Sequence, residues 1–405
     1  MTSFDTSPQL NVWRMLLALA VVFVMLTTTG WTAIRAHRGA SPLQTSLAAW
    51  SHGQVDGRAL PGPGSAPDRV ARFFSSLTEA QRLGLAERYP LAVGNMNGVP
   101  APVRYRANQV ALAQQREAEE KRTRDSRLSA LGQYEAGRRA NRFADLMRHD
   151  RQILAFDPEG SGRVAEVFGD LDRAERISVV VPGVDTDVLT FQRTYRSWSA
   201  PVGMASALYG AERAAAPAVR TAVIAWADYT APSGLGMEAA TALRAERGAV
   251  RLDALVRGLP GRSTVALYCH SYGSVVCGIA APRLPARVTD VAVAGSPGMR
   301  VERASQLRTS ARVWATRDAD DWIADVPYME VGGLGHGADP VSAAFGARVL
   351  SADGAVGHAG YFAPGTESLR NFAEIGVGAY RAVRCAHAEH EDDACRKDLP
   401  VTTAA

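Results

Sequence analysis

Ser271 stands at the centre of the pattern Cys-His-Ser-Tyr-Gly over residues 269–273, which resembles the Gly-x-Ser-x-Gly pattern of a nucleophile elbow. In such an elbow a buried strand runs directly into a helix, and the strained backbone between them exposes the serine hydroxyl. The residues before Ser271 are apolar and those after it are mostly small, which predicts this strand and helix. Cys269 replaces the first glycine, but it is also small, so the pattern predicts a nucleophile at Ser271.

A serine hydroxyl is a weak nucleophile, so it requires a general base, which an acid in turn orients. In elbows of this kind the order along the chain is serine, acid, histidine. His358 lies in a glycine-rich loop before the last predicted helix, where the base is expected, and His336 is the alternative base. Asp321 is the favoured acid, and the alternative acids are Asp318 and Asp320.

The oxyanion that forms during acyl transfer needs two backbone N–H donors. Tyr272 follows the serine directly, so its amide is the first expected donor. Val184 follows the apolar run that ends near residue 183, and its amide is the second. This chemistry needs no cofactor, and no metal site is predicted.

Short apolar runs alternate with helical patterns from residue 152 onward. Near-continuous Val, Ile and Ala are typical of strands buried on both faces of a parallel sheet. The expected strands are 153–157, 164–169, 177–183, 222–228, 264–269, 288–295 and 311–316. The sequence therefore predicts a doubly wound, mostly parallel α/β sheet within a domain over residues 152–384.

The chain in front of this domain has a different character. Residues 67–151 predict a helical section, which includes a capping box formed by Thr78 and Gln81. Residues 35–66 are rich in Gly, Pro, Ser and Ala and are expected to form a flexible linker. The stretch 107–150 is helical and dense in charge, with Gly132 as the candidate break, so we expect solvated surface helices. A protein partner for this stretch is the alternative.

Residues 12–34 form a mostly apolar run, with Arg14 near its start. About 20 apolar residues suffice to cross a bilayer, so we expect a single-pass membrane anchor. A cleaved signal segment, and hence a secreted protein, is the alternative. Arg14 precedes the run and Arg35 and Arg38 follow it, so charge counting leaves the orientation open. We favour an extracytoplasmic main domain.

The chain has four cysteines. Cys269 is the first residue of the serine pattern, and Cys277 follows eight residues later. Two buried thiols are favoured there, and a disulfide is the alternative. In the polar tail 385–405, a disulfide between Cys385 and Cys395 is favoured over two free thiols. A metal site formed by these two cysteines, His387 and His390 is the third interpretation, but this spacing matches no common zinc pattern.

The overall composition excludes some classes of partner. A hydrophobic content of 47% with 21% charged residues suits a globular protein with a large core. The net charge of +4 is too small to indicate a nucleic-acid partner, and none is expected.

Several motifs in sequence order resemble the actinobacterial α/β-hydrolases of the DUF1023 family. They lie between about residues 70 and 383 and include VVVPGVDTD, VIAWADYTAP, CHSYGSVVCG, AGSPG and GHAGYF. The resemblance implies an α/β-hydrolase fold with a helical N-terminal section, with Ser271 as nucleophile, His358 as base and an acid after VWAT. Cys269 departs from the glycine that this family usually has. The resemblance implies little about the substrate.

We therefore expect a membrane-anchored serine hydrolase that cleaves an ester or related acyl bond of a small-molecule or lipid-like substrate. Two alternatives remain open. One is a non-catalytic binding or scaffolding protein with the same fold, because a fold alone does not guarantee chemistry. The other is an acyltransferase that uses the same triad.

Overall fold

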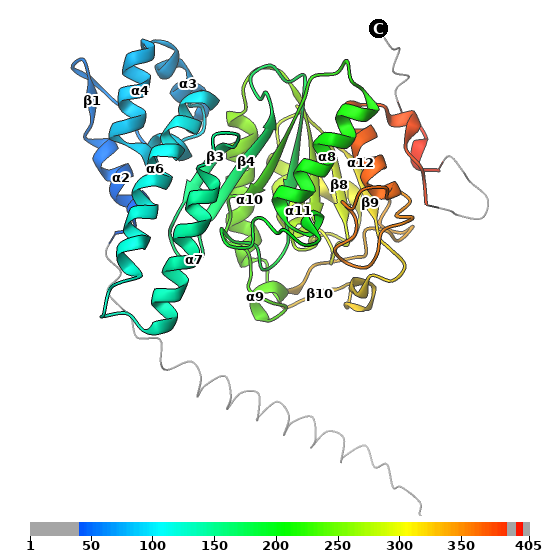
Figure 1. Cartoon of the computed structure of the whole chain (residues 1–405). Helices are drawn as coiled ribbons and strands as arrows, with labels where there is room; N and C mark the ends of the chain where they lie inside the picture. The colour runs from blue at the N-terminus through cyan, green and yellow to red at the C-terminus, as the bar shows by residue number, and fades with distance from the viewer. Residues whose placement is uncertain (1–39, 387–393, 400–405) are drawn as a thin grey trace, which may run out of the picture. The chain divides into compact units, whose positions relative to one another are not determined.

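An eight-stranded sheet forms the centre of the computed structural model, which describes residues 40–386 and 394–399 (Figure 1). Its strand order is β12-β9-β8-β7-β5-β6-β4-β3. The strands are β3 (Gln152–Asp157), β4 (Arg163–Gly169), β5 (Arg176–Val181), β6 (Thr221–Ala227), β7 (Thr264–His270), β8 (Val288–Ala294), β9 (Arg312–Thr316) and β12 (Arg348–Val349). The strands from β12 to β6 pair in parallel, whereas β4 and β3 are antiparallel. The predicted mostly parallel sheet is therefore confirmed.

All seven strands expected from apolar runs are present, and β12 is an addition. Two residues are too few to leave a recognisable pattern in the sequence, which explains why β12 was not expected. This short strand matters for the site because the chain passes from it into the loop that carries His358.

Helices cover both faces of the sheet. Consecutive strand residues point to opposite faces, so Val179 and Val180 of β5 belong to two different core clusters. Val179 packs in the cluster that includes α10 (Leu243–Gly258) and α11 (Gly273–Ala280). Val180 packs in the cluster that includes α8 (Pro201–Ala215) and α12 (Glu367–Val377). Both faces are buried, which is why the strands lack an alternating pattern.

The helical N-terminal section lies beside β3 and β4, on one side of the sheet (Figure 1). It comprises α2 (Pro42–Ser51), the hairpin β1 (Gln54–Val55) and β2 (Arg58–Ala59), α3 (Pro67–Ser75), α4 (Glu79–Arg88), α5 (Pro90–Asn95), α6 (Ala101–Arg122) and α7 (Ala130–Leu146). Thr78 caps α4 through the expected capping box with Gln81.

The structure differs from the predicted flexible linker over 35–66. Residues 42–51 form α2, and Trp50 in this helix is fully buried. The Trp50 indole N–H donates to the carbonyl oxygen of Pro61 at 2.6 Å, and its ring stacks on Phe74 at 6.3 Å. One large aromatic side chain thus anchors a segment whose composition otherwise favours a loose tether.

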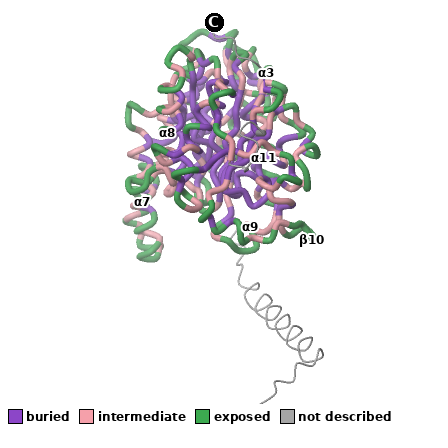
Figure 2. Tube along the Cα trace, turned by 90° about the vertical axis from the view of Figure 1, so that its right-hand side faces the viewer, coloured by how far each residue is buried: buried purple, intermediate pink, exposed green. Residues whose placement is uncertain are grey.

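Helices α6 and α7 form an antiparallel pair within the stretch expected to be helical. The break lies at residues 123–129 rather than at Gly132, because the Ser129 hydroxyl accepts a hydrogen bond from the Gly132 amide and caps α7. The pair is buried on its inner side: Asn108 donates to the Ile153 carbonyl at 2.8 Å, and Phe143 packs edge-to-face on Phe156. The exposed turns of α7 are visible in Figure 2.

The predicted membrane anchor over residues 12–34 lies outside the described residues. In the part of the chain that the structure describes, no helix has the length and apolar composition needed to cross a bilayer.

Candidate active site

Ser271 occupies a sharp turn between β7 and α11, as the elbow pattern predicts. Its φ of +54° lies in the left-handed region, which is uncommon for a residue with a side chain. Gly273 permits this turn, because a Cβ there would lie 2.2 Å from the Val181 carbonyl oxygen. A Cβ at Gly183 would lie 2.7 Å from the Ser271 Cβ. Two glycines therefore let the loop after β5 and the start of α11 close around the serine.

Three side chains from distant parts of the chain meet at this turn. The Ser271 hydroxyl donates to His358 Nε2 at 2.8 Å. The His358 Nδ1–H donates to both Asp321 oxygens, at 2.9 Å and 3.0 Å. These residues follow β7, β9 and β12, and parallel strands bring their carboxyl ends to the same edge of a sheet. The arrangement is that of a nucleophile, a base and an orienting acid.

Asp321 is held in its ionised form although it is buried. Burial alone would raise its pKa, but hydrogen bonds from His358, from the Tyr361 hydroxyl and from the Ile323 amide outweigh burial and lower the pKa below its usual value. A carboxylate in this position keeps the Nδ1 proton on the imidazole, so Nε2 stays free to accept the serine proton. Tyr361 was not expected from the sequence.

The alternative acids occupy other places. Asp318 accepts a hydrogen bond from the Gly357 amide at 2.7 Å, which fixes the loop next to His358. Asp320 is exposed. Among the described residues, neither carboxylate is paired with an imidazole, so geometry favours Asp321.

The alternative base, His336, lies near the site without reaching Ser271. Its Nε2–H donates to the Ala239 carbonyl at 2.7 Å, and its ring packs edge-to-face on Tyr272. Burial lowers the pKa of His336, so the ring is neutral. His336 thus lines the cavity beside the serine and positions its wall.

Val184 and Tyr272 flank the serine from two sides. Tyr272 is the N-cap residue of α11, where amides point out of the helix and favour negative charge. Val184 follows Gly183, and its neighbour Asp185 ties this loop to the Pro232 carbonyl at 2.9 Å. Within residues 40–386 and 394–399, neither amide donates to another protein group. Both remain available for an oxyanion.

His270 is a site residue that the sequence analysis missed. Its Nε2–H donates to the His358 carbonyl oxygen at 2.6 Å, and the two rings lie 4.9 Å apart. Burial, together with the neighbouring His358, lowers the pKa of His270 to about 3, so it remains a neutral donor. It therefore fixes the backbone of the expected base. The signal was its position directly before the serine.

Both pairs of cysteines are disulfide-bonded. Cys269 at the end of β7 is bonded to Cys277 in α11, with a Cα separation of 6.5 Å. The favoured interpretation of two buried thiols is therefore wrong, because the tight elbow folds the helix back within bonding distance of the strand. Cys385 and Cys395 form the disulfide favoured from the sequence. His387 and His390, which the metal interpretation would add, lie outside the described residues.

Replacing both Cys269 and Cys277 by alanine should lower the free energy of unfolding by about 2 kcal/mol, because the bond closes a short loop in the unfolded chain. Urea denaturation monitored by circular dichroism measures this change. The reactivity of Ser271 with a fluorophosphonate probe is a second readout. In the matched control, which replaces Cys385 and Cys395 in the tail, this reactivity should stay unchanged. An unaltered urea midpoint in the Cys269/Cys277 double variant would contradict a structural role for the elbow disulfide.

Residues 157–331 match the model of a family described as Alpha/beta hydrolase. Together with the sheet topology, this match shows an α/β-hydrolase fold. The matched segment contains the elbow and Asp321 but ends before His358. The assignment of His358 as the candidate base therefore depends on the structure and on the sequence pattern.

Two relatives that are similar in sequence come from mycobacteria. The chain is 29% identical over 378 residues to the uncharacterized protein Rv2079 of Mycobacterium tuberculosis, an alignment that covers 79% of this chain and 57% of the relative. It is 34% identical over 154 residues to the uncharacterized protein Mb0988c of Mycobacterium bovis, covering 34% of this chain and 53% of the relative. The chain thus spans little more than half the length of these relatives.

Among solved structures, the 2,6-dihydroxy-pseudo-oxynicotine hydrolase is similar with a TM-score of 0.38 and 11% identity, over 82% of this chain and 93% of that chain. Porphyromonas gingivalis dipeptidyl peptidase 4 is similar with a TM-score of 0.28 and 9% identity, over 43% of this chain and 28% of that chain.

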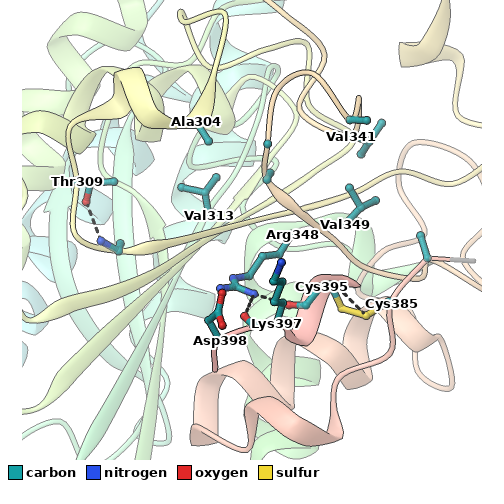
Figure 3. Close-up of a pocket in the computed structure, with 15 residues that line it drawn as sticks. Ala304, Thr309, Val313, Val341, Arg348, Val349, Cys385, Cys395, Lys397 and Asp398 are labelled. Carbon is teal, nitrogen blue, oxygen red and sulfur yellow. Dashed lines mark hydrogen bonds between the residues drawn. A yellow bond between two sulfur atoms is a disulfide. The ribbon is translucent and has the colours of Figure 1, made fainter. Parts of the chain in front are cut away.

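Two cavities of this α/β-hydrolase domain differ in character. One, of about 500 Å³, opens beside Ser271 and is lined mainly by apolar side chains. The other, of about 690 Å³, lies at the sheet edge near β12 and the tail disulfide (Figure 3). In the second cavity the Arg348 guanidinium donates hydrogen bonds to the carbonyl oxygens of Cys395 and Lys397. No candidate catalytic residue lines it, so the first cavity is the candidate substrate site.

Proposed function

We propose that this chain is a serine hydrolase that cleaves an ester or a related acyl bond, with Ser271, His358 and Asp321 as its triad. The observation that supports it most strongly is the continuous hydrogen-bonded chain from the Ser271 hydroxyl through the His358 ring to the Asp321 carboxylate. Such a series of hydrogen bonds between three separate segments serves no evident packing purpose, and its serine lines a cavity.

In the proposed reaction the Ser271 oxygen attacks the ester carbonyl carbon, and its proton passes to His358 Nε2. The amides of Val184 and Tyr272 stabilise the oxyanion that forms on the carbonyl oxygen. As the carbon–oxygen bond to the alcohol breaks, His358 returns the proton to the leaving oxygen. Water then attacks the acyl-enzyme in the same way, which releases the carboxylic acid and restores the serine.

A fluorophosphonate probe followed by peptide mapping tests this proposal. We expect one adduct, on Ser271, because only a serine activated by a neighbouring base reacts with such probes. The Ser274→Ala variant is the matched control: Ser274 lies three residues further on, and its hydroxyl donates to the Cys269 carbonyl. It should label like the wild type. A folded wild-type protein that never reacts would instead favour the non-catalytic binding protein, and product analysis would reveal acyl transfer.

We propose further, from the sequence, that the protein is a member of the DUF1023 family and that residues 12–34 anchor it to a membrane. An extracytoplasmic position of the hydrolase domain is supported by the two disulfides, which persist in oxidising compartments. A protein partner for residues 107–150 stays a hypothesis, because the inner side of α6 and α7 is already packed.

A further inference from the structure

The cavity beside Ser271 has an apolar lining. Apart from Ser271, Tyr272 and His336, the side chains that line it in the described part of the chain are apolar, and none carries a charge. Three segments supply most of them: α9 (Met237–Ala240) with the loop before it, the turn after β9, and the hairpin of β10 (Glu330–Val331) and β11 (Leu334–Gly335). Such a lining offers a polar substrate few hydrogen-bond partners in exchange for the water that the substrate loses on binding.

The walls of the cavity are tied to the elbow, so the cavity is preformed. The Tyr272 hydroxyl donates to the Thr241 carbonyl at 2.8 Å and accepts from the Ala245 amide at 3.2 Å. His336 joins the hairpin side to the carbonyl of Ala239, and Thr241 pairs with Leu334 as an isolated bridge. Figures 1 and 2 both show α9 and β10 at the same end of the molecule. The residue that follows the nucleophile thus holds the apolar wall in place.

Large apolar side chains also surround the mouth of this cavity. Most large hydrophobic residues of the domain are buried, but several cavity-lining ones are exposed to solvent: Leu235, Trp322, Met329, Val331 and Leu334. They come from segments far apart in the sequence, so their convergence on one opening is a property of the fold. Contiguous exposed apolar surface of this kind marks a binding site.

From this geometry we propose that the cavity binds the aliphatic chain of a fatty acyl ester, so that medium and long acyl chains are the preferred substrates. The inference rests on the proposed function, in which Ser271 attacks the ester carbonyl at one end of the acyl chain. A volume of about 500 Å³ is far more than an acetyl group fills, and lies within the range typical of ligand sites. The apolar mouth lets the chain enter without crossing polar groups, whether it comes from a dissolved ester or from a lipid surface.

Binding of free fatty acids to the Ser271→Ala variant tests the cavity without any need for catalysis. Each buried methylene should tighten binding about threefold to fourfold. We therefore expect dodecanoate to bind at least about 100-fold more tightly than butyrate in calorimetry. Ala240→Trp, which places a large ring in the wall, should remove this difference, whereas Ala214→Trp on the exposed side of α8 should not. Equal affinity for the two acids would overturn the proposal.

Hydrolysis of p-nitrophenyl esters, from acetyl to dodecanoyl, gives the second readout. In the wild type, kcat/KM should rise at least about 100-fold between the acetyl and octanoyl esters, and Ala240→Trp should flatten this rise. If acetyl ester is cleaved in a Ser271-dependent way but the rate does not rise with chain length, the acyl-chain site is wrong and the serine hydrolase stands. If no ester is cleaved while dodecanoate still binds selectively, the hydrolase is wrong and the chain site stands.

Variants at the exposed mouth of the cavity distinguish the two sources of the fatty acyl ester. Leu235 and Leu131 are both 66% exposed, but only Leu235 borders the cavity, since Leu131 lies in α7. If the ester is taken from a lipid surface, Leu235→Asp should abolish a rate increase seen above the critical micelle concentration, and Leu131→Asp should not. If it is taken from solution, no such increase occurs and selectivity for chain length persists below that concentration.

Discussion

Ser271→Ala should lower kcat for hydrolysis of an octanoyl ester by about 10⁴-fold or more, because it removes the hydroxyl oxygen that forms the acyl-enzyme in the proposed reaction. The loss should leave the fold intact, since an alanine fits the space of the serine. Steady-state kinetics with circular dichroism as the check on folding measures both. The change also relieves none of the elbow strain, because alanine at φ +54° is as constrained as serine.

A double variant makes this prediction sharper. When two residues act as one unit, removing the second costs little once the first is gone. Ser271→Ala combined with His358→Gln should therefore be no slower than Ser271→Ala alone. A further loss of more than about tenfold in the double variant would mean that His358 acts independently of the serine, which the 2.8 Å hydrogen bond between them argues against.

Asp321→Asn should lower kcat by about 10⁴-fold while the structure is retained. An asparagine can keep a hydrogen bond to the imidazole, but its amide favours the wrong tautomer and it no longer stabilises the imidazolium that forms during catalysis. The expected loss is large because the carboxylate is buried and accepts hydrogen bonds from His358, Tyr361 and Ile323. Solvent therefore cannot take over its stabilisation of the imidazolium. Kinetics with a saturating substrate measure the effect on kcat.

The neighbouring carboxylate is the matched control for that experiment. Asp318 accepts the Gly357 amide and does not contact the imidazole, so Asp318→Asn should reduce kcat by less than about tenfold through a looser loop. If instead Asp318→Asn is the more damaging change, Asp318 is the acid of the working enzyme and the assignment of Asp321 is wrong.

Much of the fold could be predicted because its strands are buried on both faces. Such strands read as continuous apolar runs, and each of the seven expected strands is present. The elements that were missed or misplaced have little local signal. β12 has two residues, and α2 lies in a segment rich in small residues whose order depends on the buried Trp50. Contacts between distant segments, rather than composition, decided both.

The candidate site divides in the same way. Sequence by itself determined Ser271 as the candidate nucleophile, because the elbow is a local motif in which strand, turn and helix follow one another. It also placed His358 and a group of carboxylates downstream. It left open which aspartate faces the histidine, since Asp318, Asp320 and Asp321 lie within four consecutive positions. A choice among them depends on side-chain direction, which only the folded loop defines.

Only the tertiary structure shows which residues support the candidate site from distant parts of the sequence. His270 supports His358 from 88 positions away, and Tyr361 donates to Asp321 across 40 positions. The apolar cavity draws its walls from segments around residues 240, 325 and 334. No local pattern encodes such meetings, because they arise when parallel strands deliver their carboxyl ends to one edge of the sheet. The same packing brings Cys277 back to Cys269. The cysteine that replaces the first glycine of the elbow pattern therefore forms a disulfide that joins strand and helix.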